Sequence, residues 1–331
     1  MSTRNWDVGQ LLEVSGGYWE TCALHAGVEL DLFTIIGDKQ LSPADIASGV
    51  DADTRALAML LNALSAMALL EKKDDTYGNT EAAATLLSKA SAQYLGHIIM
   101  HHHHLVDSWS RLAEAVKDGG PLRSRASVNS DAGRESFLMG MFNMAMGLAP
   151  RIVPKIDVSS CHHLLDLGGG PGTYAIFFCQ HNPDLKATVY DLPTTRPFAE
   201  KTIARFDMAD RVDFVDGNFV EEGIDGTYDA VWLSHILHGE SPESCQSIIR
   251  KAVSALGPGG KIIIHEFILN NAMDGPLFPA LFSLNMLLGT PGGQAYGEQH
   301  LIDMLTGAGV KNIQRIDIGE NENSGIISGE V

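Results

Sequence analysis

The sequence predicts an α/β protein with a doubly wound, mostly parallel sheet, a C-terminal antiparallel hairpin and a separate, mainly α-helical N-terminal domain. From about residue 156 onward, β-rich runs alternate with helical runs, as in the βαβ units of a parallel sheet. Two late β-rich runs, 312–318 and 326–329, have no helix between them, so we expect an antiparallel pair. Residues 15–105 instead contain one helical pattern after another.

The length and composition fit more than one hydrophobic core. The chain has 331 residues, of which 45% are hydrophobic and 19% are charged, and a domain usually holds roughly 150 residues. We divide the chain into a helical domain at 1–105, a helical linker region at 106–155 and an α/β domain at 156–331.

The first domain carries clear helix-start signals. Residues 18–34 are apolar at helical spacing, and Ser42 followed by Pro43 predicts an N-cap and the first residue of a helix. The stretch 51–54 predicts the start of another helix, and residues 71–78 then predict a short strand and turn. Helices followed by a small hairpin are typical of a winged-helix module.

The charge balance argues against the DNA-binding role that many winged helices have. The formal net charge is −18, whereas nucleic acids and anionic membranes attract basic surfaces.

The N-terminal residues are polar, and the sequence suggests neither a signal peptide nor a transmembrane segment. The four cysteines are far apart, so we expect no zinc site and no disulfide framework. We expect a cytoplasmic protein that holds no metal and binds neither nucleic acid nor membrane.

A histidine tract lies at the end of the first domain. On a helix, His97, His101 and His104 would share one face. Three imidazoles can ligate a transition metal, but no carboxylate or cysteine completes a recognisable signature nearby. Metal binding, the lining of a substrate pocket by His101 and His104, and an ordinary structural role all stay open.

A methionine-rich helix is predicted in the linker region. Residues 119–133 are rich in Gly, Ser and Pro and predict an exposed loop, and residues 134–147 predict the helix after it. Met141 and Met144 could form the floor of a cleft for an aromatic ring, because thioethers adapt to irregular shapes. A core helix is the equally good alternative.

The α/β domain shows a regular alternation. The expected strands are 163–167, 186–191, 211–215, 228–233 and 261–269, and the expected helices are 172–181, 195–206, 241–256 and 298–308.

A glycine-rich turn follows the first of these strands. Asp166 precedes the turn, and Gly168 and Gly170 lie within it. Glycines let the backbone approach a ligand closely, and ligands of open α/β sheets bind at the carboxyl ends of the strands. A dinucleotide fingerprint needs Gly or Ala where Thr173 stands, and a P-loop needs a lysine that is absent until Lys186. NAD and ATP are therefore disfavoured.

Asp191 ends the second strand, roughly 20 residues beyond the glycine turn, where a carboxylate can accept hydrogen bonds from both ribose hydroxyls. The spacing therefore favours an adenosine-containing ligand.

These blocks resemble the S-adenosylmethionine-dependent O-methyltransferases of the caffeic acid and acetylserotonin type, with their bacterial small-molecule relatives. The resembling segments are 109–121, 142–146, 163–173, 211–219, 235–238 (H-I-L-H) and 256–266 (L-G-P-G-G-K-I-I-I-H-E). The resemblance covers nearly the whole chain. It implies a Rossmann-like methyltransferase sheet, S-adenosylmethionine as the cofactor, a small-molecule acceptor, and a homodimer made by the N-terminal domain.

The resemblance also implies which residues bind the cofactor. They are Asp166, Gly168, Gly170, Asp191, Leu192, Asn218, Phe219 and Ser234. Asn218 stands where the family has an adenine-contacting aspartate, and its amide oxygen can still accept a hydrogen bond. Ser234 stands where plant members have a lysine.

Methyl transfer needs few protein groups. The methyl on a sulfonium is already activated, so the protein has to align the acceptor and remove its proton. His238 follows the strand 228–233 and matches the family's catalytic base. Glu266 would orient its ring. His235 is the rival base and a candidate for the substrate pocket.

The chain departs from the family pattern near this base. Gly239 and Glu240 stand where the family has Asp-Trp, and Ala295 stands where it has a second glutamate. Glu298 could substitute for that glutamate only if the loop bends. These departures put the acceptor class and the need for a base in doubt.

Three functions therefore stay open. The first is methyl transfer to a hydroxyl of a small aromatic molecule. The second keeps the fold and cofactor but changes the reaction to C-, N- or S-methylation, or to the non-methylating hydroxylase or decarboxylase chemistry of some family relatives. The third is a non-catalytic, ligand-sensing winged-helix module.

Overall fold

A computed structural model describes residues 6–125, 131–319 and 324–331. The chain divides into two compact units, Met1–Leu105 and Val106–Val331. Helix α7 (Gly96–Ser110) crosses the boundary between them. The proposed third region at 106–155 stays a prediction.

The first unit consists of short helices and one hairpin. Its elements before α7 are α1 (Val8–Gly16), α2 (Tyr18–Glu29), α3 (Leu32–Ile36), α4 (Pro43–Val50), α5 (Thr54–Ala66), β1 (Leu70–Lys73), β2 (Thr76–Asn79) and α6 (Glu81–Leu86). The Ser42 side chain accepts a hydrogen bond from the amide of Asp45 and so caps α4, as predicted. Asp53 caps α5 in the same way, and β1 pairs antiparallel with β2.

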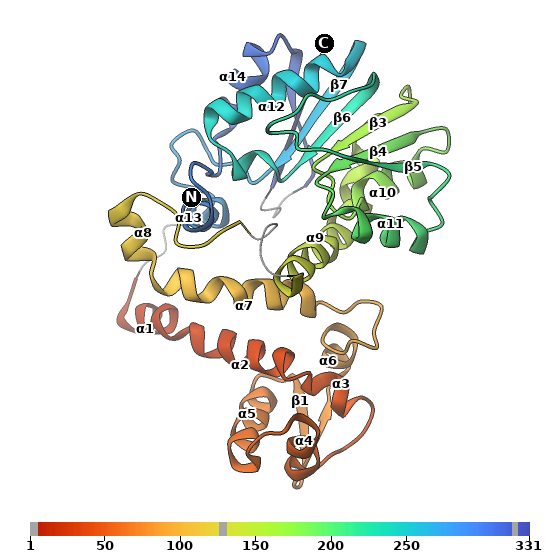
Figure 1. The fold of residues 1–331 in the computed structure, drawn as a ribbon. Helices are drawn as coiled ribbons and strands as arrows, with labels where there is room; N and C mark the ends of the chain where they lie inside the picture. Colours follow the sequence, from red (N-terminus) through yellow and green to blue (C-terminus); the bar gives the residue numbers. More distant parts are fainter. Residues whose placement is uncertain (1–5, 126–130, 320–323) are drawn as a thin grey trace. The chain divides into compact units, whose positions relative to one another are not determined.

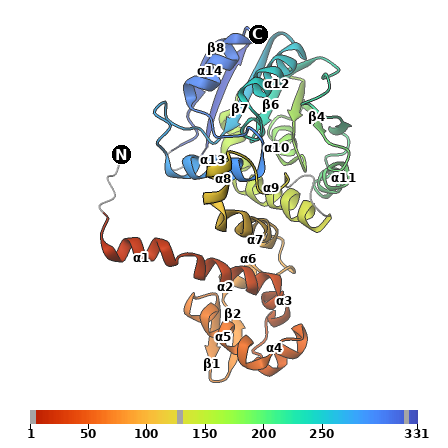
Figure 2. The same cartoon turned by 60° about the vertical axis from the view of Figure 1, so that its left-hand side comes forward.

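One predicted helix in this unit is wrong in its extent. Residues 18–34 form two helices, because Asp31 adopts a left-handed φ of 55° between them. Helix α1 is absent from the sequence-based prediction, and none of its residues is buried. Helices α1 and α2 follow one another nearly end to end (Figure 2).

The second unit is an α/β domain. Its helices after α7 are α8 (Leu112–Asp118), α9 (Asp131–Ile152), α10 (Thr173–His181), α11 (Arg196–Arg205), α12 (Pro242–Ser254), α13 (Leu277–Gly289) and α14 (Glu298–Gly307). Its strands are β3 (His163–Leu167), β4 (Lys186–Asp191), β5 (Val212–Asp216), β6 (Tyr228–Ser234), β7 (Leu256–Glu266), β8 (Lys311–Ile316) and β9 (Gly325–Glu330).

The sheet has the predicted doubly wound topology. The strand order is β5-β4-β3-β6-β7-β9-β8, and the first five strands in this order are parallel. Alternate side chains of β3 face opposite ways: Leu164 joins the core under α9, α10 and α11, and Leu165 joins the core under α12 and α14 (Figure 1). Helices therefore cover both faces.

The antiparallel hairpin is confirmed, with an order that the sequence did not indicate. β9 pairs antiparallel with both β7 and β8, so it lies between them.

Two further differences between the structure and the sequence-based prediction concern helices. Helix α9 begins at Asp131, inside the loop predicted at 119–133, of which residues 126–130 lie outside the described part; helix α13 was not predicted.

One segment of the described chain, Gly133–Lys155, has the length and apolar composition of a membrane-crossing helix, contrary to the expectation that no stretch would. This segment contains most of α9, and Ala149 and Ile152 from it are fully buried in the core together with α10. A buried core helix passes the same test of length and composition.

Candidate active site

The candidate residues gather at the carboxyl ends of the strands. The order of the sheet reverses between β3 and β6, since β4 and β5 extend from one side and β7 from the other. Ligands of doubly wound sheets bind outside the carboxyl ends of the strands at such a point. The glycine turn follows β3, and the segment with His235 and His238 follows β6.

The glycine turn requires its glycines. Gly168, Gly170 and Gly172 have φ of 68°, 54° and 78°, values that side chains with a Cβ rarely adopt. A Cβ at Gly168 would lie 2.6 Å from Ile236 Cγ2, in the segment after β6. The turn can therefore lie against that segment only with glycine at this position.

Two carboxyl groups lie at this turn, the buried Asp166 and the half-buried Asp191. Asp166 is 1% exposed, its Oδ2 accepts the amide of Ala175 at 3.2 Å, and its Oδ1 has no hydrogen-bond partner among the described residues. Burial raises the pKa of Asp166 to about 7, with Asp191 adding to the rise. Burial also raises the pKa of Asp191, although the amides of Gly170 and Leu192 oppose the rise. Two desolvated acids favour a cationic ligand, because a nearby positive charge stabilises their ionised forms.

Asp191 has capacity left for a ligand. Its Oδ2 accepts the amide of Gly170 at 2.8 Å, and its Oδ1 accepts the amide of Leu192 at 2.7 Å and the Thr195 hydroxyl at 3.1 Å. A carboxylate offers about four acceptor sites, so one remains. The partnerless Oδ1 of Asp166 and this remaining site fit a ligand that carries a positive charge and hydroxyl groups.

Three other predicted cofactor residues, Asn218, Phe219 and Ser234, lie at or just after the carboxyl ends of β5 and β6. Asn218 follows β5, and its Oδ1 accepts the amide of Val220 at 3.1 Å. A ring atom of Phe219 would lie 3.1 Å from a Cβ at Gly168. Ser234 ends β6, and its hydroxyl lies 3.1 Å from Nδ1 of His265.

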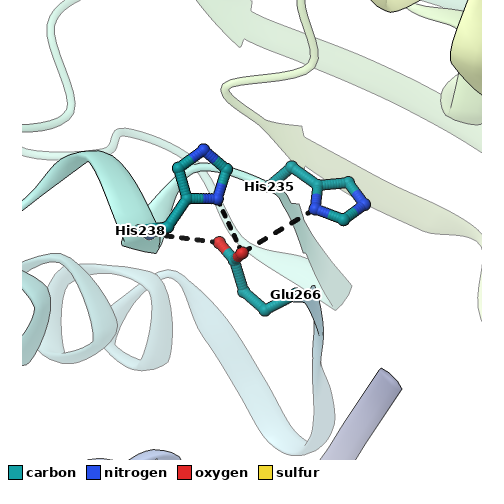
Figure 3. A group of neighbouring side chains, drawn as sticks. All are labelled: His235, His238 and Glu266. Atoms are coloured by element: carbon teal, nitrogen blue, oxygen red, sulfur yellow. Dashed lines mark hydrogen bonds and ion pairs between the residues drawn. The ribbon is translucent and has the colours of Figure 1, made fainter. Parts of the chain in front are cut away.

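His238 and Glu266 form a hydrogen-bonded pair (Figure 3). Nδ1 of His238 lies 2.8 Å from Oε2 of Glu266. The carboxylate is itself fixed, because its Oε1 accepts the amides of Leu237 at 2.8 Å and of His238 at 3.3 Å, and its Oε2 lies 3.3 Å from the amide of Phe267. The 3-10 turn at Leu237–Gly239 is thus attached to the end of β7.

The electrostatics of the pair set the histidine tautomer. Burial alone would raise the pKa of Glu266, but the interactions with His238, which is hydrogen-bonded to it, and with the nearby His235 hold that pKa well below its ordinary value. An ionised carboxylate can only accept hydrogen bonds, so Nδ1 of His238 carries the proton. In the neutral form of this ring, Nε2 then has a free lone pair.

His235 lies beside this pair in an unusual conformation. Its φ is 56°, and its ring packs 4.2 Å from that of Phe267 and 4.3 Å from that of His265, between ring centroids. Nδ1 of His235 lies 3.7 Å from Oε2 of Glu266, which is longer than a hydrogen bond. Burial lowers the pKa of His235, which favours its neutral form.

An aromatic wall of Phe267, Phe278 and Phe282 borders His238, and sequence reasoning missed it. The ring of Phe282 meets that of His238 edge to face, with centroids 4.7 Å apart. Phe267 packs against Phe278 at 5.0 Å and against Phe282 at 4.6 Å. The signal available was the run L-F-P-A-L-F at the start of α13.

The structure shows the surroundings of the residues that depart from the family pattern. A Cβ at Gly239 would meet nothing within 4 Å, so open space lies beside the base. Glu240 is buried and paired with Arg125, which also donates to the carbonyl of Gly239 at 2.9 Å. Ala295 is fully buried. Glu298 is paired with Arg315 of β8.

The remaining predicted pocket residues lie on two helices. His101 and His104 are in α7, within the unit that ends at Leu105. Met141 and Met144 are partly exposed on α9 in the second unit. Their role as pocket residues stays a prediction.

Comparisons with known proteins identify the family of this chain. Residues 109–311 match the model of the O-methyltransferase domain, and residues 12–89 match that of the O-methyltransferase dimerisation domain. This chain belongs to the O-methyltransferase family. The expected enzyme class, an S-adenosylmethionine-dependent O-methyltransferase of small molecules, is confirmed.

Three relatives illustrate the range of this O-methyltransferase family. The 3-hydroxy-5-methyl-1-naphthoate 3-O-methyltransferase of Streptomyces sahachiroi is 30% identical over 96% of this chain and 94% of its own. The L-tyrosine C(3)-methyltransferase of Streptomyces lavendulae is 29% identical over 89% of this chain and 85% of its own. The solved structure of PigF with SAH has a TM-score of 0.90 and 27% identity, and the match covers 98% of this chain and 100% of that one.

Proposed function

We propose that this enzyme methylates a hydroxyl of a small aromatic molecule, with His238 as the general base and Glu266 as its positioning residue. The observation that carries the proposal is the 2.8 Å hydrogen bond between His238 Nδ1 and Glu266 Oε2, in a pair bordered by aromatic rings.

The chain's own residues have three tasks in this reaction. S-adenosylmethionine supplies a methyl group that its sulfonium already activates. The aromatic wall holds the acceptor ring, and Nε2 of His238 accepts the hydroxyl proton as the oxygen becomes a nucleophile. Ionised Glu266 stabilises the resulting imidazolium, because it already accepts the proton on Nδ1.

The residues around the base favour a large, planar acceptor. The rings of Phe278, which is 39% exposed, and of the half-buried Phe282 lie over the buried ring of Phe267 and are accessible for aromatic packing. The open space at Gly239 leaves room for a substituent or a second fused ring. The hydroxynaphthoate relative acts on such a molecule according to its name, so hydroxynaphthoates and substituted phenols are the first acceptors to try.

For the cofactor, we infer that Asp191 accepts hydrogen bonds from the ribose and that Asp166 stabilises the positive charge of the methionine end. The raised pKa of both acids and the partnerless oxygen of Asp166 support these roles. Gly168 and Gly170 would let the backbone approach the cofactor closely. Four further residues would complete the binding site for its adenosine part: Leu192, Asn218, Phe219 and Ser234.

The test is turnover of a hydroxynaphthoate or phenol panel with labelled S-adenosylmethionine. His238→Ala should keep cofactor affinity and lose about 10²–10⁴-fold in turnover, the usual contribution of general acid–base catalysis. The matched control is His181→Ala, at the end of α10 and exposed, which should leave turnover unchanged. Near-wild-type turnover by His238→Ala, under conditions where chemistry limits the rate, would refute the base.

C-methylation is the second candidate, because a relative of 29% identity is named as a C-methyltransferase. A phenolate also activates its ring carbons, so the same base serves both reactions. Analysis of the product distinguishes O-methylation from C-methylation. An O-methyl ether no longer has the acidic phenol proton, whereas a C-methylated phenol keeps it.

We further propose that the first unit is a winged-helix-like module that forms a homodimer. The match to a dimerisation domain supports this, as do the exposed apolar side chains of α1 and α2, among them Val8, Leu12 and Trp19 at 75%, 66% and 69% exposure. We also propose a cytoplasmic enzyme, and the net charge of −18 supports the proposal that it binds neither nucleic acid nor anionic membranes.

A further inference from the structure

We propose that His235, His238 and Glu266 also form a binding site for a divalent transition metal such as Zn²⁺, and that metal bound there switches off the base. This proposal departs from the expectation of no metal site, which considered only the histidine tract and the cysteines. Metal binding is independent of the proposed function, whereas the inhibition rests on the role of His238 as the base.

The three side chains already converge. Each offers one ligand atom, and these atoms all lie within 4.8 Å of one another (Figure 3). Oε2 of Glu266 lies 2.8 Å from Nδ1 of His238 and 3.7 Å from Nδ1 of His235. Metal–ligand bonds of about 2.0–2.2 Å in a tetrahedral site place neighbouring ligand atoms roughly 3.3 Å apart. The two distances from Glu266 therefore need to change by about half an ångström, and the two histidine nitrogens, at most 4.8 Å apart, need to approach by up to about 1.5 Å.

His235 has ring nitrogens available for such an ion. Both are buried and have no hydrogen-bond partner among the residues that the structure describes. Its backbone is fixed by a 2.8 Å hydrogen bond from its amide to the carbonyl of His265, in a left-handed conformation that is uncommon for residues other than glycine. Among the described residues, the imidazole of His235 thus has no hydrogen bond, and its Nδ1 lies 3.7 Å from a buried carboxylate.

The ligand types select the class of metal. Two imidazoles and one carboxylate suit Zn²⁺, Co²⁺, Ni²⁺ and Fe²⁺, whereas Ca²⁺ and Mg²⁺ prefer a shell of oxygen atoms. Three protein ligands leave one position of a tetrahedral ion for water, as in many catalytic zinc sites.

Metal on Nδ1 would abolish the base by moving one proton. A neutral imidazole carries a single N–H, which in the free enzyme is on Nδ1 and faces Glu266. When Nδ1 binds the metal, that proton is carried by Nε2, so the ring stays neutral and no redox change occurs. Nε2 then has no lone pair with which to accept the proton of the substrate.

The experiment uses the full chain, freed of metal with a chelator, and Co²⁺ as a spectroscopic substitute for Zn²⁺. We expect one Co²⁺ per chain with the visible absorption of a four- or five-coordinate ion, and displacement by Zn²⁺. His235→Asn should weaken binding at least tenfold, since loss of a ligand exceeds the 10–100-fold effect of an outer-shell partner. Asparagine tolerates the left-handed φ, so this variant should fold, and its thermal unfolding checks that it does.

A matched control tests whether cobalt binds to the histidine tract of α7 and not to the proposed site. The double variant His101→Gln/His104→Gln removes the tract in α7 and should leave the cobalt spectrum unchanged. Cobalt binding that survives in His235→Asn, or that disappears in the tract variant, would overturn the site. Binding at the proposed site without loss of methyl transfer would overturn the inhibition alone. Methyl transfer that requires His238 but is insensitive to metal, with no cobalt bound, would reject the metal site and leave the proposed function standing.

Discussion

Glu266→Gln should reverse the tautomer of His238 while leaving its ring in place. Oε1 of Glu266 accepts two backbone amides, from Leu237 and His238, so the glutamine oxygen has to occupy that position. The glutamine NH₂ group would then face Nδ1 of His238. Two donors cannot share a hydrogen bond, so the histidine proton moves to Nε2 and the ring can no longer act as a base.

The magnitudes follow from these contacts. Hydrogen bonds to a charged acceptor are worth about 1.5–3 kcal/mol, against about 0.5–1.5 kcal/mol for a neutral one, so each of the two backbone amides loses about 1 kcal/mol. The amide of Phe267 loses the acceptor that it has at 3.3 Å. Relief from burying a charge offsets part of this. We expect the free energy of unfolding to fall by about 2–4 kcal/mol and turnover to fall by about 10²–10⁴-fold.

Two measurements test this reasoning. Nitrogen chemical shifts of isotope-labelled histidine report which ring nitrogen of His238 carries the proton, and urea titration gives the stability. Glu200→Gln is the matched control: its exposed ion pair with Arg196 should be worth less than about 0.5 kcal/mol. If Glu266→Gln keeps the proton on Nδ1 and turnover within a few-fold of the wild type, the tautomer argument is refuted.

Three further predictions concern the cofactor, the dimer and pH. Asp191→Ala should weaken S-adenosylmethionine binding by about 1.5–3 kcal/mol in calorimetry, whereas Asp184→Ala, an exposed carboxylate before the same strand, should not; equal affinities would contradict the ribose contact. Leu12→Asp should convert a dimer to a monomer in sedimentation at micromolar concentration, because it puts a charge on the apolar face of α1; a wild-type monomer would contradict the dimer. Burial, and then His235, hold the pKa of His265 well below its ordinary value, so below about pH 6.5 the unfolded chain binds a proton that the folded chain does not. Stability should therefore fall as the pH drops below about 6.5, and His265→Gln should reduce that slope by up to about 1.4 kcal/mol per pH unit in urea titrations; an unchanged slope would show that His265 does not titrate in this way.

The sequence predicted the parallel sheet because its signals are local. Strand β4 is buried at four successive residues, Ala187 to Tyr190, and this β-rich, mostly apolar run is recognisable in the sequence. The Ser42 cap and the glycine turn are also readable within a few residues. Helix α13 was missed because its residues are apolar almost all round and Pro279 lies in its first turn, so helical periodicity is hidden.

The site was predictable only where a residue could be matched to a motif. His238 and Glu266 are 28 residues apart, and they meet because β6 and β7 are neighbours in the sheet. The aromatic wall depends on the path of the chain from β7 to α13, which no local pattern specifies. The position of the His235 ring depends on a left-handed backbone conformation that is uncommon outside glycine and that no local pattern in the sequence indicates.

The position of β9 constrains how the sheet can form. β8 is made before β9, yet β8 can join the sheet only through β9, which must first pair with β7 at Glu266 and Gly325. Closing so long a loop is slow compared with pairing the strands of a simple hairpin. Until it closes, β7 exposes unpaired backbone groups beside Ile262 and Ile264, a template for pairing with other chains. Substitutions that weaken β9 should therefore appear first as aggregation during synthesis, before any change in the chemistry at His238.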